Sequence, residues 1–238
     1  MAREAVSRQK PASLDLVGRQ VQVRVRKVRG ARRMTLRIDA AEDAVDLTLP
    51  RWVSVAEGLR FAESKRDWLE RRLGALPPRV RFECGARVPL HGEAHRIRHD
   101  AAALPMVWRA GAEIRVGGPA REVAARIEAW IKAEAKRALE RRAAEKAALL
   151  DLAPPPVRLR DTRSLWGSCS PAGRLSFTWR LLFAPESVFD YVVAHEVAHL
   201  KHMNHGKRFW TLVEQLTPDA DSARDWLRRE GTRLHRYG

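Results

Sequence analysis

One short stretch constrains this chain more than any other. Residues 191–206 read Tyr-Val-Val-Ala-His-Glu-Val-Ala-His-Leu-Lys-His-Met-Asn-His-Gly and contain the pattern H-E-x-x-H. On an α-helix, residues four apart lie on one face, so His195 and His199 can direct both imidazoles at one point. Imidazole nitrogens bind Zn²⁺ at about 2.0–2.1 Å. Glu196, beside the first ligand, can reach a water on the metal without binding the metal itself.

This pattern is too specific to be accidental. In a chain of 238 residues with 8 His, about 0.02 chance matches to H-E-x-x-H are expected. Requiring another His at a fixed later position lowers that number about thirtyfold. Neither His195 nor His199 has an obvious alternative role, so a solvated helix that happens to carry histidines is the weaker interpretation.

The third ligand has two candidates, because a catalytic zinc takes three protein ligands and leaves one position for water. His202 lies on the same helix face, but about 10 Å along the axis from the first histidine, so it could join the site only if the helix ended early. His205 is flanked by Asn204 and Gly206, which tolerate the left-handed backbone of a turn after a helix. We therefore expect His205 to be the third ligand and His202 to lie outside the ligand set.

Further motifs accompany the metal-binding helix. They are Leu165-Trp-Gly-Ser-Cys-Ser170, Trp179-Arg-Leu181, Ala184-Pro185, Tyr191-Val-Val193 and Asn204-His-Gly-Lys-Arg-Phe-Trp210, with Arg32-Arg-Met-Thr-Leu-Arg37 and Lys65-Arg-Asp-Trp68 nearer the start. With these motifs the chain resembles the YgjP-like metallopeptidase domain, a family related to the SprT-like and WLM zinc proteases within the gluzincin-like or metzincin-like zincins. The resemblance is dense from about Thr162 to Trp226. One departure is Ser176-Phe-Thr178, where an Asn near the strand end is expected; it bears on a loop or substrate contact and not on the metal.

The resemblance implies both a fold and a site. The implied fold is α+β, a zincin-like metallopeptidase core with an N-terminal β-rich region. The implied zinc ligands are His195, His199 and His205, and Glu196 is the implied catalytic base. Zinc, when bound, would lower the pKa of water towards neutrality, and Glu196 would accept a proton from the water that attacks the carbonyl.

Several residues near the helix have open roles. Trp166, Gly167 and Ser168 are candidate cleft residues, and Gly167 would allow close approach of a substrate backbone. Alternatively, Trp166 packs beneath the helix and Cys169 is a small buried residue. Cys169 is not expected to bind zinc, because three histidines complete the protein's share of ligands. The candidate donors to the oxyanion, each with a structural interpretation as well, are Arg163, Arg180 and Tyr191.

The remaining chain alternates between predicted strands and helices. Period-2 alternation predicts strands near 19–26, 34–38 and 45–49, which we interpret as a small antiparallel sheet. A capping box at Ser54–Glu57 begins a helix that Gly74 ends. The later expected elements are short strands within 80–118, a long helix over about 121–150, strands at 157–160 and 175–179, and the metal-binding helix over about 186–203.

These elements predict three regions. Residues 1–18 form a flexible basic tail, residues 19–118 a β-rich region with one helix, and residues 119–238 a zincin-like catalytic domain. The N-terminus is too polar for a signal peptide, and no apolar run approaches the roughly 18 residues of a membrane span. The 2 Cys do not build a disulfide framework, so we expect a cytoplasmic protein. Because no apolar run is long enough for a membrane span, we expect no membrane partner.

The charge of the chain points to a second class of partner. The 45 Lys and Arg outnumber the 29 Asp and Glu, which gives a formal net charge of +16. Within residues 1–37, the only acidic residues are Glu4 and Asp15. Such a chain is drawn to polyanions by counterion release, although a solvated basic face is the simpler explanation.

Three functions therefore follow from the sequence. The favoured one is a metallopeptidase that uses Zn²⁺ to cleave a peptide or protein substrate. The first alternative is a metal-dependent hydrolase of a non-peptide substrate such as a nucleotide phosphoanhydride, because the site defines an activated water and not the bond that it attacks. The second alternative, motivated by the basic surface, is a nucleic-acid-associated protease or binding module. The oligomeric state does not follow from the sequence.

Overall fold

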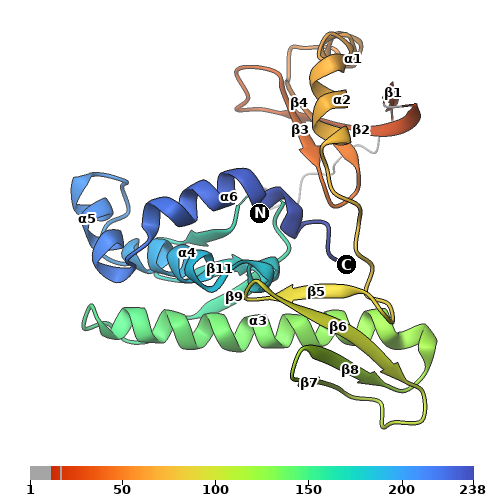
Figure 1. Ribbon diagram of the computed structural model, residues 1–238. Coiled ribbons are helices and arrows are strands. Elements are labelled where there is room, and N and C mark those ends of the chain that lie inside the picture. Colours follow the sequence, from red (N-terminus) through yellow and green to blue (C-terminus); the bar gives the residue numbers. More distant parts are fainter. Residues whose placement is uncertain (1–11, 17, 164) are drawn as a thin grey trace, which may run out of the picture. The chain divides into compact units, whose positions relative to one another are not determined.

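Figure 1 shows the computed structural model, which describes residues 12–16, 18–163 and 165–238. The chain divides into two compact units, with the boundary between Pro77 and Pro78. This boundary precedes the expected one at 118/119, because the strands that follow Pro78 share a hydrophobic core with the long helix after residue 119. The α+β class is confirmed. No helix in the described ranges is both long and apolar enough to cross a membrane.

The first unit is built on a four-stranded sheet in the order β1-β2-β4-β3. Its strands are β1 (Ala12–Leu16), β2 (Arg19–Val28), β3 (Thr35–Asp39) and β4 (Ala44–Pro50). The expected antiparallel sheet is wrong at its centre, where β2 and β4 are parallel; the outer pairs are antiparallel. β4 takes a central position because Val45, Leu47 and Leu49 are all buried, whereas β3 is an edge strand that exposes Arg37.

The expected N-terminal tail is wrong where the structure describes it. Residues 1–11 and 17 lie outside the described residues. Residues 12–16 form β1, which pairs antiparallel with β2 through contacts such as Leu14 with Val21. Leu16 is fully buried in the core of this unit, and Leu14 packs against that core. The alternation of these few residues is too short to be recognised against a polar background.

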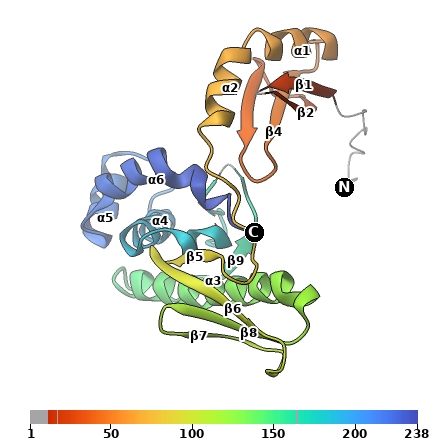
Figure 2. The ribbon, with the colours of Figure 1, turned by 45° about the vertical axis from the view of Figure 1, so that its right-hand side comes forward.

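Two helices, α1 (Val55–Glu63) and α2 (Arg66–Gly74), cover one face of this sheet (Figure 2). The predicted capping box is confirmed, because the Glu57 amide donates to Ser54 Oγ at 3.1 Å and the Ser54 amide donates to Glu57 Oε2 at 2.8 Å. The single helix expected up to Gly74 is instead broken after Glu63. The Ser64 hydroxyl donates to the Phe61 carbonyl at 2.8 Å, a local bond that competes with helix continuation.

The second unit begins with a sheet of the same topology. Its strands are β5 (Arg87–Leu90), β6 (Glu93–Asp100), β7 (Val107–Ala110) and β8 (Glu113–Gly117), in the order β5-β6-β8-β7. The central pair is again parallel and the outer pairs antiparallel. The turn between β5 and β6 uses His91 and Gly92 with φ of 50° and 85°, the left-handed geometry of a two-residue hairpin loop.

Helix α3 (Val123–Ala148), preceded by the short turn η1 (Ala120–Glu122), crosses this unit (Figure 1). It confirms the helix expected over about 121–150. Every fourth residue of α3 faces the core, which gives the fully or nearly buried series Val123, Ile127, Ile131, Ala135, Leu139, Ala143 and Ala147. A three-stranded sheet follows in the order β10-β11-β9, with β9 (Val157–Arg160), β10 (Gly167–Cys169) and β11 (Leu175–Thr178). The edge strand β10 was not expected.

The chain then passes through the turn η2 (Trp179–Phe183) into α4 (Glu186–Ala198), α5 (Lys207–Leu216) and α6 (Ala220–Leu234). Nine of the 13 residues of α4 are buried, and this helix contacts α3, α5, α6 and β10. The end of the chain is tied to the start of the unit, because the Val80 amide donates to the Arg236 carbonyl at 2.8 Å. The helix that carries the H-E-x-x-H pattern is therefore the centre of this unit.

A cluster of charges joins α4 to α3. Asp190 on α4 accepts hydrogen bonds from Arg142 and Lys146 of α3, with Lys146 Nζ 2.8 Å from Asp190 Oδ1. The three side chains are between 12% and 17% exposed. Burial alone would raise the pKa of Asp190, but hydrogen bonds from Lys146, Thr217 and Arg142 outweigh it and hold this pKa below its ordinary value.

We expect Asp190→Asn to lower the free energy of unfolding by about 2–4 kcal/mol at pH 7, because it removes the carboxylate that the largely buried Lys146 pairs with, whereas Arg142 keeps Glu186 and Glu145. Asp225→Asn removes only an exposed partner of Arg228 and should cost less than about 0.5 kcal/mol.

The contribution of Asp190 to the free energy of unfolding should depend on pH, because folding lowers the pKa of this carboxyl. The contribution is present above the unfolded pKa of about 3.9 and is lost as the pH falls through the folded pKa. Urea unfolding at several pH values measures this, and an Asp190→Asn deficit that persists undiminished at low pH would contradict it.

Candidate metal centre

The H-E-x-x-H residues lie at the end of α4. His195 and Glu196 belong to its last turn, and His199 is its C-cap residue. The helix ends at Ala198, before the expected end near residue 203, because the amides of residues 200–202 donate to the carbonyls of Val197 and Ala198 in a closing turn. This early end frees the chain to fold back towards the helix.

The connection to α5 brings His205 back to the first two histidines. Gly206 is extended, with φ −82° and ψ −179°, and Asn204 does not have a positive φ, so the left-handed turn expected at these residues is wrong. The Gly206 amide instead donates to the Asn204 carbonyl at 2.8 Å. Trp210, on the first turns of α5, donates its indole N–H to the His205 carbonyl at 3.1 Å and so holds the connection in place.

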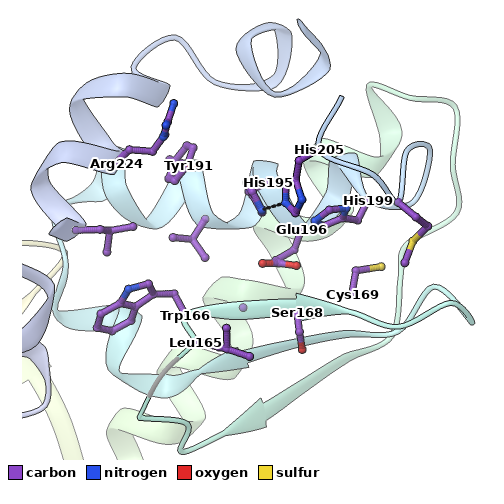
Figure 3. A pocket seen from close by; sticks show the side chains of 14 residues that line it. Leu165, Trp166, Ser168, Cys169, Tyr191, His195, Glu196, His199, His205 and Arg224 are labelled. Carbon is purple, nitrogen blue, oxygen red and sulfur yellow. Dashed lines mark hydrogen bonds between the residues drawn. The ribbon is translucent and has the colours of Figure 1, made fainter. Parts of the chain in front are cut away.

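The three imidazoles converge on one point (Figure 3). One ligand nitrogen from each of His195, His199 and His205 lies within 4.8 Å of the other two. The Nε2 atoms of His195 and His205 are 3.2 Å apart, close to the roughly 3.3 Å that separates two nitrogens on a tetrahedral zinc ion. His199 Nδ1 lies 3.1 Å from the His202 carbonyl; this contact leaves Nε2 for the centre. The donors therefore fit a divalent cation, and His202 contributes its backbone rather than its ring.

Burial keeps the histidines in the form that binds metals. It lowers the pKa of His195 to about 4, helped by the neighbouring imidazoles of His199 and His205. Burial likewise lowers the pKa of His199. A neutral imidazole offers a nitrogen lone pair, which protonation would remove. At neutral pH the first two histidines are thus ready to act as ligands without losing a proton.

Glu196 points towards the same centre from below the histidines (Figure 3). It is 6% exposed, and burial raises its pKa to about 7. Its side chain lies against Gly167 of β10, where a Cβ atom would fall 2.6 Å from Glu196 Oε1. The room that we expected Gly167 to provide for a substrate backbone is therefore occupied by the Glu196 carboxylate.

A cavity of about 550 Å³ opens beside these residues. Trp166, Gly167, Ser168 and Cys169 line it, as does Tyr191. Figure 3 shows the Ser168 side chain pointing away from the histidines. Trp166 also packs beneath α6, because it stacks on His235 at a centroid distance of 5.1 Å and leaves no room for a Cβ at Gly231. Trp166 thus lines the cavity and packs against α6, whereas its expected packing beneath the metal-binding helix stays a prediction.

The other candidates of the sequence analysis lie elsewhere. Arg180 does not line the cavity; its guanidinium donates to Asp161 and to the Tyr237 carbonyl and lies 4.3 Å from the Trp179 ring. Arg163 does not line the cavity either. Cys169 lines the cavity, but among the described residues its sulfur does not belong to the cluster of possible metal ligands, which consists of three histidines. Of the three proposed oxyanion donors, only Tyr191 reaches the cavity.

Some residues of the cavity were missed by sequence reasoning. They are Leu165, Val192, Met203, Arg224 and Leu227. Arg224 and Leu227 come from one face of α6, which is recognisable as an amphipathic helix but whose partner the sequence does not reveal. Arg224 lies 4.9 Å from the Trp210 ring and 3.0 Å from Asp221 Oδ1. Its guanidinium group is a positive charge in the lining of a mainly apolar cavity.

A centre of three histidines and a buried glutamate in an α+β unit is typical of metal-dependent hydrolases. The family model of the YgjP-like metallopeptidase domain matches residues 32–230. The chain therefore belongs to the YgjP-like metallopeptidase domain family, and the resemblance recognised in the sequence is confirmed. Membership implies a divalent metal; the zincin core stays a prediction.

Two other comparisons add little. Among solved structures, the metallopeptidase zymogen of Pyrococcus abyssi abylysin is 27% identical over 42% of this chain and 96% of that chain, with a TM-score of 0.35. That TM-score is too low to support a common fold. No curated protein sequence matches the chain significantly.

We expect Trp210→Phe to weaken binding of a divalent metal by about three- to tenfold, because it keeps a ring against the histidines but removes the hydrogen bond to the His205 carbonyl. A competition titration against a chromophoric zinc chelator measures the affinity. Trp130→Phe, on α3 and outside the histidine cluster, is the matched control. Equal affinities for wild type and Trp210→Phe would show that the indole does not hold the His205 connection.

Proposed function

We propose that this protein is a zinc-dependent peptidase in which His195, His199 and His205 hold the metal and Glu196 is the general base. The observation that carries the proposal is the convergence of three imidazoles beside one buried carboxylate. Membership of a metallopeptidase family supports the reaction class. Zinc, when bound, supplies a Lewis acid that acidifies water and polarises the scissile carbonyl.

The roles of the protein's own side chains follow from their positions. Glu196 accepts a proton from the attacking water and returns it to the leaving amine. Burial raises the pKa of its carboxyl towards neutrality, although a divalent cation nearby would lower this pKa again. Tyr191 is the one hydroxyl of our oxyanion candidates that lines the cavity. Burial raises the pKa of Tyr191, so its hydroxyl stays protonated and able to donate a hydrogen bond.

The lining of the cavity favours a peptide over a strongly anionic substrate. Its walls carry large apolar side chains, of which Leu165 and Met203 are 57% and 50% exposed. Exposed apolar side chains beside a reactive centre suit the side chains of an unfolded polypeptide. Arg224 is the one Lys or Arg side chain among the described residues that line the cavity, and it would suit a phosphoanhydride. Nucleotides are therefore the alternative substrates to test beside a polypeptide.

The paired variants His199→Ala and Glu196→Gln test the two halves of the proposal. We expect His199→Ala to lose bound zinc, and Glu196→Gln to keep zinc but lose at least about a hundredfold in turnover of unfolded, fluorescein-labelled casein. His202→Ala is the matched control, because only its backbone contacts the site; it should keep both. Zinc is counted by elemental analysis of the purified chains.

The outcomes separate the alternatives. Release of phosphate from nucleoside triphosphates, without cleavage of casein, would replace the peptidase proposal by the non-peptide hydrolase. Normal turnover by Glu196→Gln would remove Glu196 from the role of base. Full zinc content in His199→Ala would overturn the ligand assignment.

Gly167→Ala tests the position of the base without touching a ligand. The added methyl would overlap Glu196 Oε1 and Cγ, so the carboxylate must move. We expect turnover to fall by about ten- to a hundredfold with zinc content unchanged. Gly74→Ala, where a Cβ meets nothing within 4 Å, should behave as wild type. Unaltered turnover in Gly167→Ala would mean that the observed position of Glu196 is not the working one.

A further inference from the structure

Basic residues gather at one end of the sheet in the first unit. The parallel strands β2 and β4 end together, because Val28 is paired with Pro50. The segments that follow them therefore leave the sheet side by side, one through Arg29 to β3 and the other through Arg51 to α1. Lys27 Nζ donates to the Arg51 carbonyl at 3.5 Å, which joins the end of β2 to the segment that follows β4.

The open face of the sheet extends this charge. The helices cover the face that carries Val23 and Val45, so alternate residues of the strands face solvent. Arg26 on β2 and Arg37 on β3 are among them, and both are exposed. Arg24, on the same face, is instead neutralised by Asp46 at 2.9 Å and by Asp39.

We call this surface the arginine end. It consists of Arg26, Lys27, Arg29, Arg32, Arg33, Arg37, Arg51 and Trp52, all exposed. Five of its arginines form no ion pair with any described residue: Arg26, Arg29, Arg32, Arg33 and Arg37. Acidic neighbours are few. The sequence from residue 16 to residue 38 contains none. Asp46 is the β4 partner of Arg37 in the sheet register. The pKa of Glu57 is lowered mainly by hydrogen bonds with Ser54 and to a smaller extent by the charges of Arg60 and Lys27.

The arginine end also carries an indole that nothing covers. Trp52 is 70% exposed, against 37% for Trp68, the other exposed Trp among the described residues. It directly follows Arg51, between the last residue of β4 and the first turn of α1. An exposed aromatic face among unpaired guanidinium groups offers stacking and anion binding on one surface.

We propose that the arginine end binds single-stranded nucleic acid, with the guanidinium groups on successive phosphates and a base stacked on Trp52. Guanidinium groups match phosphate bidentately, and all but one of the cations here are arginines. Base stacking on one aromatic side chain is independent of sequence, and phosphate contacts are likewise. The inference uses residues outside the metal centre and does not depend on the proposed peptidase activity.

A negatively charged membrane surface is the rival partner, because arginine and tryptophan also occur at bilayer interfaces. Interfacial binding requires an apolar face that enters the acyl boundary. In the described part of the first unit, the exposed large apolar side chains are only Trp52 and Trp68, and Trp68 lies on α2. The single indole and the planar cations favour nucleic acid.

The test is binding of the full chain to a fluorescein-labelled 20-mer of thymidine, followed by anisotropy between 50 and 200 mM salt. In the triple variant Arg29→Gln, Arg32→Gln, Arg33→Gln, we expect at least tenfold weaker binding at 50 mM salt and a salt slope reduced by about 2, since each phosphate contact to a single strand contributes about 0.7. Trp52→Ala should weaken binding about fivefold or more without changing the slope.

A charge-matched control separates a site from a general attraction. The triple variant Arg81→Gln, Arg121→Gln, Arg229→Gln removes the same charge from exposed positions of the second unit and should change the affinity less than threefold. Thermal unfolding verifies that each variant is folded. Equal losses in the two triple variants would overturn the proposal, as would equal binding of a duplex together with no effect of Trp52→Ala. Tighter binding to vesicles of phosphatidylglycerol than to the oligonucleotide, lost in the first triple variant, would assign the surface to membranes.

Discussion

The burial of a carboxylate among three imidazoles is the interaction on which the second unit depends. Burial raises the pKa of Glu196 to about 7 and lowers that of His195 to about 4, and both shifts mean that the charged forms are disfavoured. A divalent cation at the centre reverses this balance for the carboxylate, whose charged form it attracts, and reinforces it for the imidazoles, whose neutral forms bind the metal. Binding of the metal and ordering of the end of α4 are therefore linked. The Asp190 cluster holds the same helix against α3 from the other side.

The two units use one sheet topology for different purposes. In each, a parallel central pair is flanked by two antiparallel edge strands, in the orders β1-β2-β4-β3 and β5-β6-β8-β7. The second sheet joins the core around α3, where Ile97 and Ile114 pack with Ile127. The first sheet buries one face under its own two short helices and exposes the other. The same fold element thus supports the metal centre in one unit and leaves a charged surface in the other.

Sequence reasoning succeeded where the determining contacts are local. The capping box at Ser54, the stripe along α3 and the i, i+4 pair of His195 and His199 are each decided within a few residues, and the structure reproduces their geometry. It failed where distant segments decide. The partner of β2 is a strand beyond β3, and the neighbour of Gly167 is Glu196, which comes 29 residues later in the sequence. No local pattern identifies such partners, so the parallel pair and the wall of the cleft required the structure.

Net charge alone does not locate a binding surface, and the distribution of ion pairs explains why. Helix α3 is rich in cations, yet most of them have a carboxylate three or four residues away: Arg126 with Glu122, Lys132 with Glu128, Lys136 with Glu140, and Arg137 with Glu134. Such a helix contributes little field beyond a Debye length. At the arginine end, five guanidinium groups have no described partner, so their fields add. The guanidinium groups of the arginine end therefore attract a polyanion more strongly than the paired cations of α3, although both sets contribute to the charge of +16.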